Sequence, residues 1–323
     1  MSLRRLVPVA ALTAVAATGC TLPGAPQPVG GEYPSKTVNV IVPYAAGGPT
    51  DVAARAMSEC LGTYFDTRFI VENRDGGAGA IGTLEMLASR PDGYTLGVGT
   101  SGSVAIAPLL SEHATYEPSD IKPITKIYEL ASALVVLDDS RYTSGKQLLD
   151  DAKKGRKVTV AVGGASTEYA LELRRMAKDY GINLTVVPFA GGAPAQNGLL
   201  GGNVDALFAA VNQPLMGLIK DGTIRPLFTG GEKRAPHLPE VPTLAELGYK
   251  KLTNTTAFFA LAGPAGMDSE VVKRLRAGAS HCQEDPTLRK QLGANFIPKQ
   301  PGTPASISRE WAESSADAKE ILK

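Results

Sequence analysis

The chain has 323 residues, which is enough for two domains with separate cores. Its 33 lysines and arginines nearly balance its 32 aspartates and glutamates, so no bulk field draws it to nucleic acid or acidic lipid. Frequent glycine (35) and proline (23), with a single tryptophan, favour an α/β protein with many short turns.

The N-terminus has the pattern of an export signal. Two arginines precede an apolar run over residues 6–17 that is too short to span a membrane as a stable helix. The run ends in Ala17-Thr18-Gly19-Cys20, which resembles a bacterial lipobox. We expect residues 1–19 to be removed as a signal peptide and Cys20 to be lipidated; the alternative is plain cleavage nearby, leaving a soluble protein. The Pro- and Gly-rich residues 20–35 are expected to be the lipid-anchored tether.

Lipidation of Cys20 would leave two cysteines, Cys60 and Cys282, in an oxidising compartment. Cys60 lies on the same predicted helix face as Met57 and Tyr64, so it could be a small buried core residue. It could instead form a disulfide with Cys282 that ties the first helix to a late one. The sequence leaves both alternatives open.

Residues 38–55, VNVIVPYAAGGPTDVAAR, begin with β-branched residues that predict a strand buried on both faces. Small residues then allow backbone to approach a ligand closely. Pro49 suits the first position of a helix, which makes Gly48 the expected cap. Free backbone N–H groups at such a helix start form an anion site. Asp51, in the first turn, most simply complements the helix dipole.

The rest of the chain alternates strands with helices. Strands are predicted over 68–72, 94–99, 158–162, 184–188, 204–209, 224–228 and 256–261, with two extended runs within 124–138. Helices are predicted over 49–64 and 78–89, after 100–103, from 163–168 to Gly181, after 189–194, and from Pro214, Asp268 and Thr303. The last helix places Ile307, Trp311, Ala318 and Leu322 on one face, so Trp311 is predicted to pack in the core.

Residues 77–82 (GAGAIG) fit the G-x-G-x-x-G dinucleotide pattern, but polar residues separate them from the preceding strand and no acid closes a later strand. We interpret these glycines as letting a helix approach a sheet or a ligand. His113, His237 and His281 lie far apart in dissimilar contexts, and no nucleophile elbow or Walker loop is present. No metal, cofactor or catalytic residue is therefore predicted.

One order of features recurs: strand, small or hydroxyl residues, helix start. It occurs at 44–51, 100–103, 163–168 and 189–194. Ligands of open parallel sheets bind beyond the carboxyl ends of the strands, where such openings converge. Because two openings come from each half, we expect a cleft between two domains that closes around a small ligand.

The openings offer hydrogen-bond donors in excess. Their hydroxyls and helix-start N–H groups suit a carboxylate, and no lysine or arginine lies inside them. Glu168 has two interpretations. Facing the cleft, it would repel a second ligand carboxylate and favour an amine or hydroxyls there. Turned away as a helix-start residue, it would leave a di- or tricarboxylate possible.

Six motifs carry a family resemblance: YPSK (33–36), IVPYAAGGPTD (41–51), VENR (71–74), PDGYTL (91–96), LLGGNVD (199–205) and LPEVPT (238–243). In these motifs and their order the mature chain resembles, nearly end to end, the tripartite tricarboxylate transporter substrate-binding family, also called Bug receptors. The resemblance implies an α/β clamshell like that of periplasmic binding proteins, each domain a mostly parallel sheet flanked by helices. Domain 1 is expected to span 36–131 and 256–323, and domain 2 132–255.

The resemblance also implies a function. It implies a monomeric, extracytoplasmic receptor that captures a small organic carboxylate and delivers it to membrane permease subunits, contacting the membrane only through its lipid anchor and binding no nucleic acid. The expected ligand contacts are Tyr44, Ala46, Gly47, Gly48, Thr50, Asp51, Thr100, Ser101, Gly164, Ala165, Ser166, Thr167, Glu168, Phe189, Gly191 and Gly192.

Three positions depart from the family pattern. The family usually has proline where Ala46 stands, a basic residue near Ala190 and histidine near Tyr169, so the identity of the ligand stays open. Two other functions are alternatives: a lipoprotein of the same fold that presents its ligand to a signalling partner, and an exported enzyme. The missing catalytic constellation argues against the enzyme.

Overall fold

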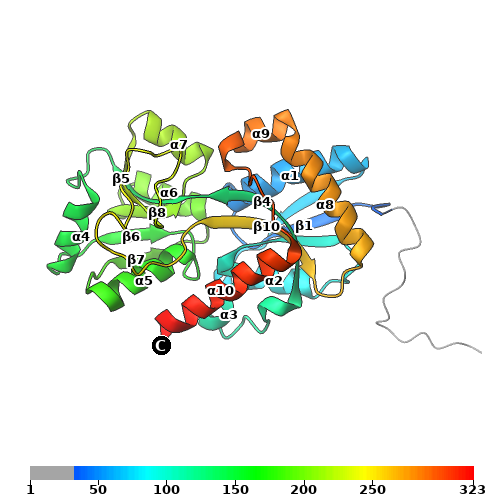
Figure 1. Ribbon diagram of the computed structural model, residues 1–323, viewed down its shortest axis with the longest axis horizontal. Coiled ribbons are helices and arrows are strands. Elements are labelled where there is room, and N and C mark those ends of the chain that lie inside the picture. The colour runs from blue at the N-terminus through cyan, green and yellow to red at the C-terminus, as the bar shows by residue number, and fades with distance from the viewer. Residues whose placement is uncertain (1–32) are drawn as a thin grey trace, which may run out of the picture.

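The computed structural model describes residues 33–323; the predicted signal, Cys20 and the tether up to residue 32 lie outside the described residues. Figure 1 shows two lobes side by side along the long axis, each with a central sheet flanked by helices. Within 33–323, no helix has the length and apolar character needed to cross a membrane. The two-domain α/β clamshell predicted from the sequence is confirmed.

Lobe 1 is built on a sheet with the strand order β2-β1-β3-β10-β4. Its strands are β1 (Val38–Val42), β2 (Phe69–Asn73), β3 (Thr95–Gly99), β4 (Ile121–Leu130) and β10 (Ala257–Pro264). Its helices are α1 (Pro49–Phe65), α2 (Ala80–Leu87), α3 (Ala107–Leu110), α8 (Ser269–Glu284), α9 (Pro286–Leu292) and α10 (Pro304–Leu322). β1 pairs in parallel with β2 and β3, whereas β10 is antiparallel to both β3 and β4.

Lobe 2 repeats this arrangement with the order β7-β6-β8-β5-β9. Its strands are β5 (Ser132–Leu137), β6 (Thr159–Val162), β7 (Thr185–Pro188), β8 (Ala206–Ala210) and β9 (Ile224–Thr229). Its helices are α4 (Gly145–Lys153), α5 (Glu168–Tyr180), α6 (Gly192–Leu200) and α7 (Gln213–Lys220). β5 is antiparallel to its neighbours β8 and β9. Both sheets are therefore mostly parallel, as predicted, and the antiparallel strand in each is the one that enters from the other lobe.

Most predicted elements are present, with ends shifted by one to three residues. α2 begins later than expected because Gly77–Gly79 form a separate 3₁₀ turn in which Ala78 has φ 59°. β10 continues past the predicted end at Leu261 to Pro264 because it pairs with β4 along its whole length. The sequence did not reveal α4 or α9.

The structure corrects the end of the tether. The prediction placed residues 33–35 in it, but Tyr33 is buried in the core of lobe 1 and its hydroxyl donates to the carbonyl oxygen of Gly93 at 2.7 Å. The ring of Tyr33 also packs edge-on against Tyr94, with centroids 5.2 Å apart. The folded part of the chain therefore includes Tyr33.

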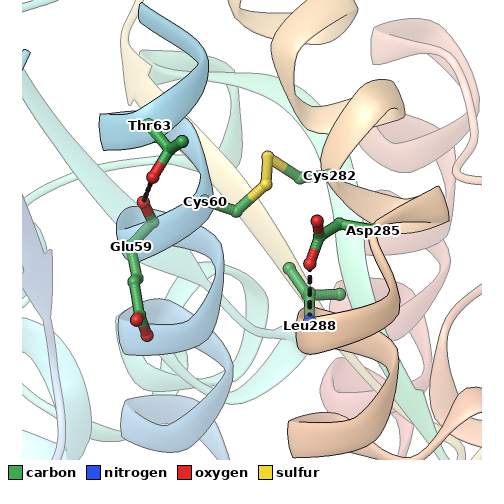
Figure 2. Close-up of a disulfide and its surroundings, with 6 residues drawn as sticks. All are labelled: Glu59, Cys60, Thr63, Cys282, Asp285 and Leu288. Carbon is green, nitrogen blue, oxygen red and sulfur yellow. Dashed lines mark hydrogen bonds between the residues drawn. A yellow bond between two sulfur atoms is a disulfide. The ribbon is translucent and has the colours of Figure 1, made fainter. Parts of the chain in front are cut away.

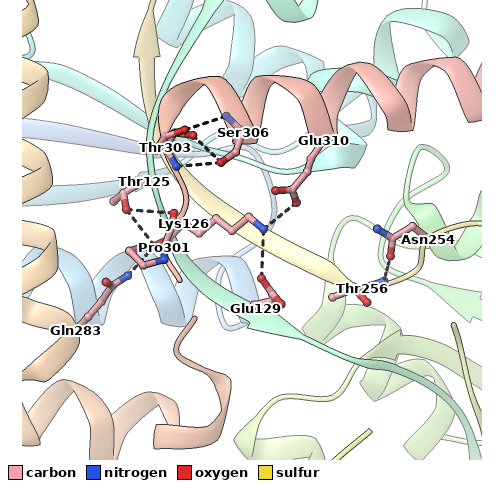
Figure 3. A network of polar contacts seen from close by, with 10 residues as sticks. All are labelled: Thr125, Lys126, Glu129, Asn254, Thr256, Gln283, Pro301, Thr303, Ser306 and Glu310. Atoms are coloured by element: carbon pink, nitrogen blue, oxygen red, sulfur yellow. Dashed lines mark hydrogen bonds and ion pairs between the residues drawn. The ribbon is translucent and has the colours of Figure 1, made fainter. Parts of the chain in front are cut away.

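α10 braces the two lobes. The chain passes from β4 to β5 and returns to β10 (Figure 1), while α10 starts on lobe 1. Figure 3 shows the Nζ of Lys126, on β4, paired with Glu310 of α10 at 2.8 Å and with Glu129 at 3.3 Å. At the other end of α10, the Nζ of Lys178 on α5 donates to the carbonyl oxygen of Glu320 at 2.9 Å. The C-terminal helix thus contacts both lobes.

Two sequence expectations concern packing in lobe 1. Trp311 is fully buried and stacks on Phe258 with centroids 6.3 Å apart, which confirms its core role. Cys60 on α1 and Cys282 on α8 form a disulfide with a Cα–Cα distance of 5.7 Å (Figure 2). The disulfide alternative is therefore the one the structure supports, and it fastens α1 to the last third of the chain.

Candidate functional site

A cavity of about 110 Å³ lies between the lobes, beyond the carboxyl ends of their parallel strands. Lobe 1 lines it with Tyr44, Gly47, Gly48, Pro49, Thr50, Thr100 and Phe259. Lobe 2 lines it with Gly163, Thr167, Glu168, Tyr169, Gly192, Ala193, Gln196, Leu207, Ala209, Ala210, Asn212, Pro214 and Leu215. The loops after β1, β3, β6 and β7 all reach this cavity, which is the convergence that the four openings predicted.

The predicted contact residues fall into two groups. Those that line the cavity are Tyr44, Gly47, Gly48, Thr50, Thr100, Thr167, Glu168 and Gly192. The others are absent from its lining: Ala46, Asp51, Ser101, Gly164, Ala165, Ser166, Phe189 and Gly191. In the second group, Phe189 packs beneath α6, since its ring leaves no room for a Cβ at Gly198.

The start of α1 leaves backbone donors free at the cavity. Gly48 is the N-cap and makes no side-chain cap hydrogen bond, and Pro49 follows it at the first helical position, as predicted. The N–H groups of Thr50 and Asp51 therefore have no partner within the helix. Gly47 has φ +82°, a conformation that favours glycine, and this turns the loop into the helix.

Asp51 supports that loop from behind. Its carboxylate accepts the N–H of Gly47 at 2.9 Å, the Nε of Arg55 at 3.0 Å and the Nδ2 of Asn73 at 3.0 Å. Burial raises the pKa of Asp51, but the hydrogen bonds from Arg55, Gly47 and Asn73 outweigh it and leave the pKa below its usual value. Asp51 thus does more than complement the dipole, because it fixes the position of the Gly47 backbone.

The start of α6 faces the start of α1 across the cleft. Its N-cap, Gly191, also provides no side-chain hydrogen bond, so the N–H groups of Gly192 and Ala193 lack helical partners. A Cβ placed on Gly48 would lie 3.3 Å from the nitrogen of Gly192 and 3.6 Å from that of Ala193. Two uncapped helix N-termini therefore meet at the cavity, with their positive dipole ends toward it.

Two hydrogen bonds join the lobes beside the cavity. The N–H of Ala45 donates to the carbonyl oxygen of Ala190 at 3.2 Å, and the buried hydroxyl of Ser166 donates to that of Ala78 at 2.7 Å. Ala78 belongs to the glycine-rich stretch 77–82. Gly82 lets α2 pack closely, since a Cβ there would lie 2.7 Å from the carbonyl oxygen of Arg74. The stretch thus permits close packing, as interpreted, and it also forms an interlobe contact.

The rest of the polar wall includes several hydroxyls and one acid. The Oη of Tyr44 lies 3.0 Å from the Oγ1 of Thr100, and burial raises the pKa values of Tyr44 and Tyr169, which therefore stay neutral. Glu168 lines the cavity, which favours the cleft-facing interpretation. Burial raises its pKa to about 7, partly offset by its own backbone N–H and by Tyr169. None of the lining residues is lysine, arginine or histidine.

Three polar lining residues were missed by the sequence prediction: Tyr169, Gln196 and Asn212. Asn212 caps α7, its side-chain oxygen accepting the N–H of Leu215 at 3.1 Å. It follows β8 by two residues and precedes a helix with an early proline, so it occupies a fifth opening of the kind described above. Its amide side chain differs from the small and hydroxyl residues that define the four predicted openings. Gln196 lies one turn inside α6, where only the fold reveals its direction.

Comparison with known proteins supports this architecture. The sequence model of the family described as "Tripartite tricarboxylate transporter family receptor" matches residues 51–323. Protein BugT of Bordetella pertussis (strain Tohama I) is 30% identical over 244 residues, covering 74% of each chain. The periplasmic binding protein BugD has a TM-score of 0.81 and 27% identity, covering 90% of this chain and 97% of BugD. R. palustris Rpa4515 with adipate has a TM-score of 0.81 and 26% identity, with the same coverage. On this evidence the chain belongs to the receptor family of the tripartite tricarboxylate transporters.

Proposed function

We propose that the chain is an extracytoplasmic solute-binding lipoprotein that closes its two lobes around a small organic carboxylate and delivers it to permease subunits of a tripartite tricarboxylate-type transporter. It acts as a receptor and not as an enzyme. The moving units are residues 33–131 with 256–323, and residues 132–255, so the start of the first predicted unit moves from 36 to Tyr33.

One observation carries the proposal: α1 and α6, from different lobes, point uncapped N-termini at a cavity with no basic side chain in its lining. Each helix end presents two backbone N–H groups without helical partners, and a carboxylate can accept from both ends at once. Because the two donor sets belong to different lobes, the anion bridges them and stabilises closure. The adipate bound to Rpa4515 supports a carboxylate ligand.

A thermal-shift screen of organic acids, followed by calorimetry on the strongest binder, tests the proposal. Gly48→Val places a side chain against the nitrogen of Gly192, so it should weaken binding more than tenfold while the protein still folds. The matched control is Gly217→Val on α7, where nothing lies within 4 Å of the added Cβ. An unchanged affinity in Gly48→Val would remove the 44–51 loop from the site.

Anchoring and delivery need tests in cells. Cys20→Ser should move the protein from the membrane fraction to the soluble extracytoplasmic fraction. Loss of the receptor gene should abolish uptake of the ligand identified by calorimetry, and the wild-type gene should restore it. If uptake persists without the receptor while the purified protein still binds the acid, a sensing role would replace the transport role.

A further inference from the structure

Among residues 33–323, Glu168 is the one acidic side chain in the cavity lining, and no basic partner is paired with it. It begins α5, is 6% exposed, and shares the cavity with the uncapped ends of α1 and α6. Asp51, in the first turn of α1, is also buried but is paired with Arg55 at 2.9 Å. The carboxylate of Glu168 therefore faces the ligand with its charge uncompensated by any side chain in the lining.

The other side chains that line the two cavities beside Glu168 are neutral or acidic. Tyr169, beside it on α5, donates a hydrogen bond, and Tyr44 faces it from lobe 1. On its other side lies a second cavity of about 250 Å³, which Glu168 shares with three acids of α10: Glu310, Glu313 and Asp317. Of these, Glu310 is paired with Lys126 at 2.8 Å. Neither cavity is lined by lysine, arginine or histidine.

A second negative charge in this cavity is costly. A bridged anion already occupies the donors of α1 and α6 under the proposed function, so a second ligand carboxylate must lie elsewhere along the wall, where Glu168 is the charged group. Two carboxylates that share a site do not both stay ionised, because one takes up a proton and donates a hydrogen bond to the other. Burial raises the pKa of Glu168 to about 7, which makes Glu168 the carboxyl that takes up this proton.

We propose, on the basis of the proposed function, that Glu168 couples ligand charge to a proton: a linear dicarboxylate binds together with one proton on Glu168, whose protonated carboxyl donates to the second carboxylate of the ligand. The proton comes from solvent and moves to a carboxylate oxygen of Glu168; no other bond changes. A ligand that carries an ammonium at its far end binds with Glu168 ionised and takes up no proton. Glu168 therefore makes the pH dependence of binding differ between dicarboxylates and amino acids.

Calorimetry with matched probes tests this linkage. At each chain length from four to six carbons the probes are the α,ω-dicarboxylate, the monocarboxylate and the ω-amino acid, for example adipate, hexanoate and 6-aminohexanoate. Titrations at pH 8 in triethanolamine and in Tris, two cationic buffers that differ in ionisation enthalpy, count the protons exchanged. We expect the dicarboxylate to bind with uptake of nearly one proton and to weaken about tenfold per pH unit above 7. The ω-amino acid should bind without uptake.

Two variants locate the proton. Glu168→Gln should bind the dicarboxylate with no proton uptake and with an affinity that no longer depends on pH between 6 and 8. Glu313→Gln, which alters only the second cavity, should keep the wild-type uptake. Binding of a dicarboxylate without proton uptake, or uptake that persists in Glu168→Gln, overturns this inference and leaves the receptor function standing. If neither the nine probes nor any acid of the thermal-shift screen binds to a correctly folded protein, the carboxylate-receptor function itself is contradicted.

Discussion

β1 and β6 hold equivalent places, second from the edge of their sheets, and each leads through a short loop into a helix that begins at the cavity. Both helices carry an acid in their first turn, Asp51 in α1 and Glu168 in α5. The caps differ, since Gly48 offers α1 no side chain, whereas the Oγ1 of Thr167 accepts the N–H of Ala170 in α5 at 3.3 Å. The two openings have the same order of strand, loop and helix, but the surroundings of their acids differ.

The difference lies in what reaches each acid. Arg55 and Asn73 bind Asp51, whose pKa falls and whose charge serves the fold. Burial raises the pKa of Glu168, and the hydrogen bonds from its own backbone N–H and from Tyr169 offset this rise only in part, so its charge is available to the ligand. An acid in the first turn of a helix therefore serves structure or binding according to whether a base reaches it, as Arg55 of the same helix reaches Asp51. Its position at the helix start does not decide.

The largest expected effect concerns the disulfide that links α1 to α8, since the helix after β6 has no such bond. Replacing both Cys60 and Cys282 by serine removes a disulfide that closes a loop of 222 residues. The chain-entropy account gives a loss of up to about 5 kcal/mol in the free energy of unfolding. Urea denaturation of the oxidised protein and the double variant measures this loss. Equal stability of the two would show that the bond does not form in the exported protein.

The second concerns the pH dependence that Glu168 gives to stability. Because its folded pKa, about 7, lies above the unfolded value near 4.5, its contribution is present below pH 4.5 and is lost as pH rises through 7. Glu168→Gln should thus gain about 3 kcal/mol relative to wild type between pH 4.5 and pH 8. Urea denaturation at both pH values measures the change. Parallel pH profiles for wild type and Glu168→Gln would contradict the burial argument.

The third concerns Asp51 and should show the opposite slope. Its folded pKa is depressed, so the stability it contributes is present above the unfolded pKa, about 3.9, and is lost as pH falls through the folded value. Asp51→Asn should cost about 2 kcal/mol at pH 7, since it weakens charge-assisted hydrogen bonds from Arg55 and Gly47, and less at pH 3. A cost that does not change with pH would mean that the amide replaces the carboxylate fully.

The comparison of the two acids also marks how far the sequence predicts this protein. The openings were predictable because proline, glycine and hydroxyl residues at strand ends act locally, as Gly48 and Thr167 show. The partner of Asp51 at i+4, Arg55, is also visible in the sequence. The surroundings of Glu168 are not visible in the sequence, because they are formed by segments that lie far from it along the chain. The place of β10 between β3 and β4 likewise follows from pairing across more than 120 residues of chain.

Asn212 and the two cysteines are further residues whose contacts the sequence does not predict. Asn212 was missed because a cap that binds the N–H of Leu215 has the same sequence pattern whether or not it borders a cavity. Cys60 and Cys282 could not be assigned as a pair until α1 and α8 were placed side by side. Local sequence signals predict where helices begin; contacts between distant segments decide what each beginning does.

The smallest expected effect concerns a hydrogen bond between the two lobes next to the cavity. The hydroxyl of Ser166, just before α5, donates to the carbonyl oxygen of Ala78 in the other lobe at 2.7 Å. A neutral hydrogen bond of this kind contributes about 1 kcal/mol, so Ser166→Ala should weaken ligand binding about fivefold. The loss should fall on the dissociation rate, because the bond forms only when the lobes close. Ser89→Ala removes a serine-to-carbonyl bond of 2.6 Å within lobe 1 and should leave affinity unchanged. Stopped-flow release of a bound organic acid measures both variants. If Ser166→Ala and Ser89→Ala release the ligand at the same rate, the Ser166 bond does not hold the lobes closed.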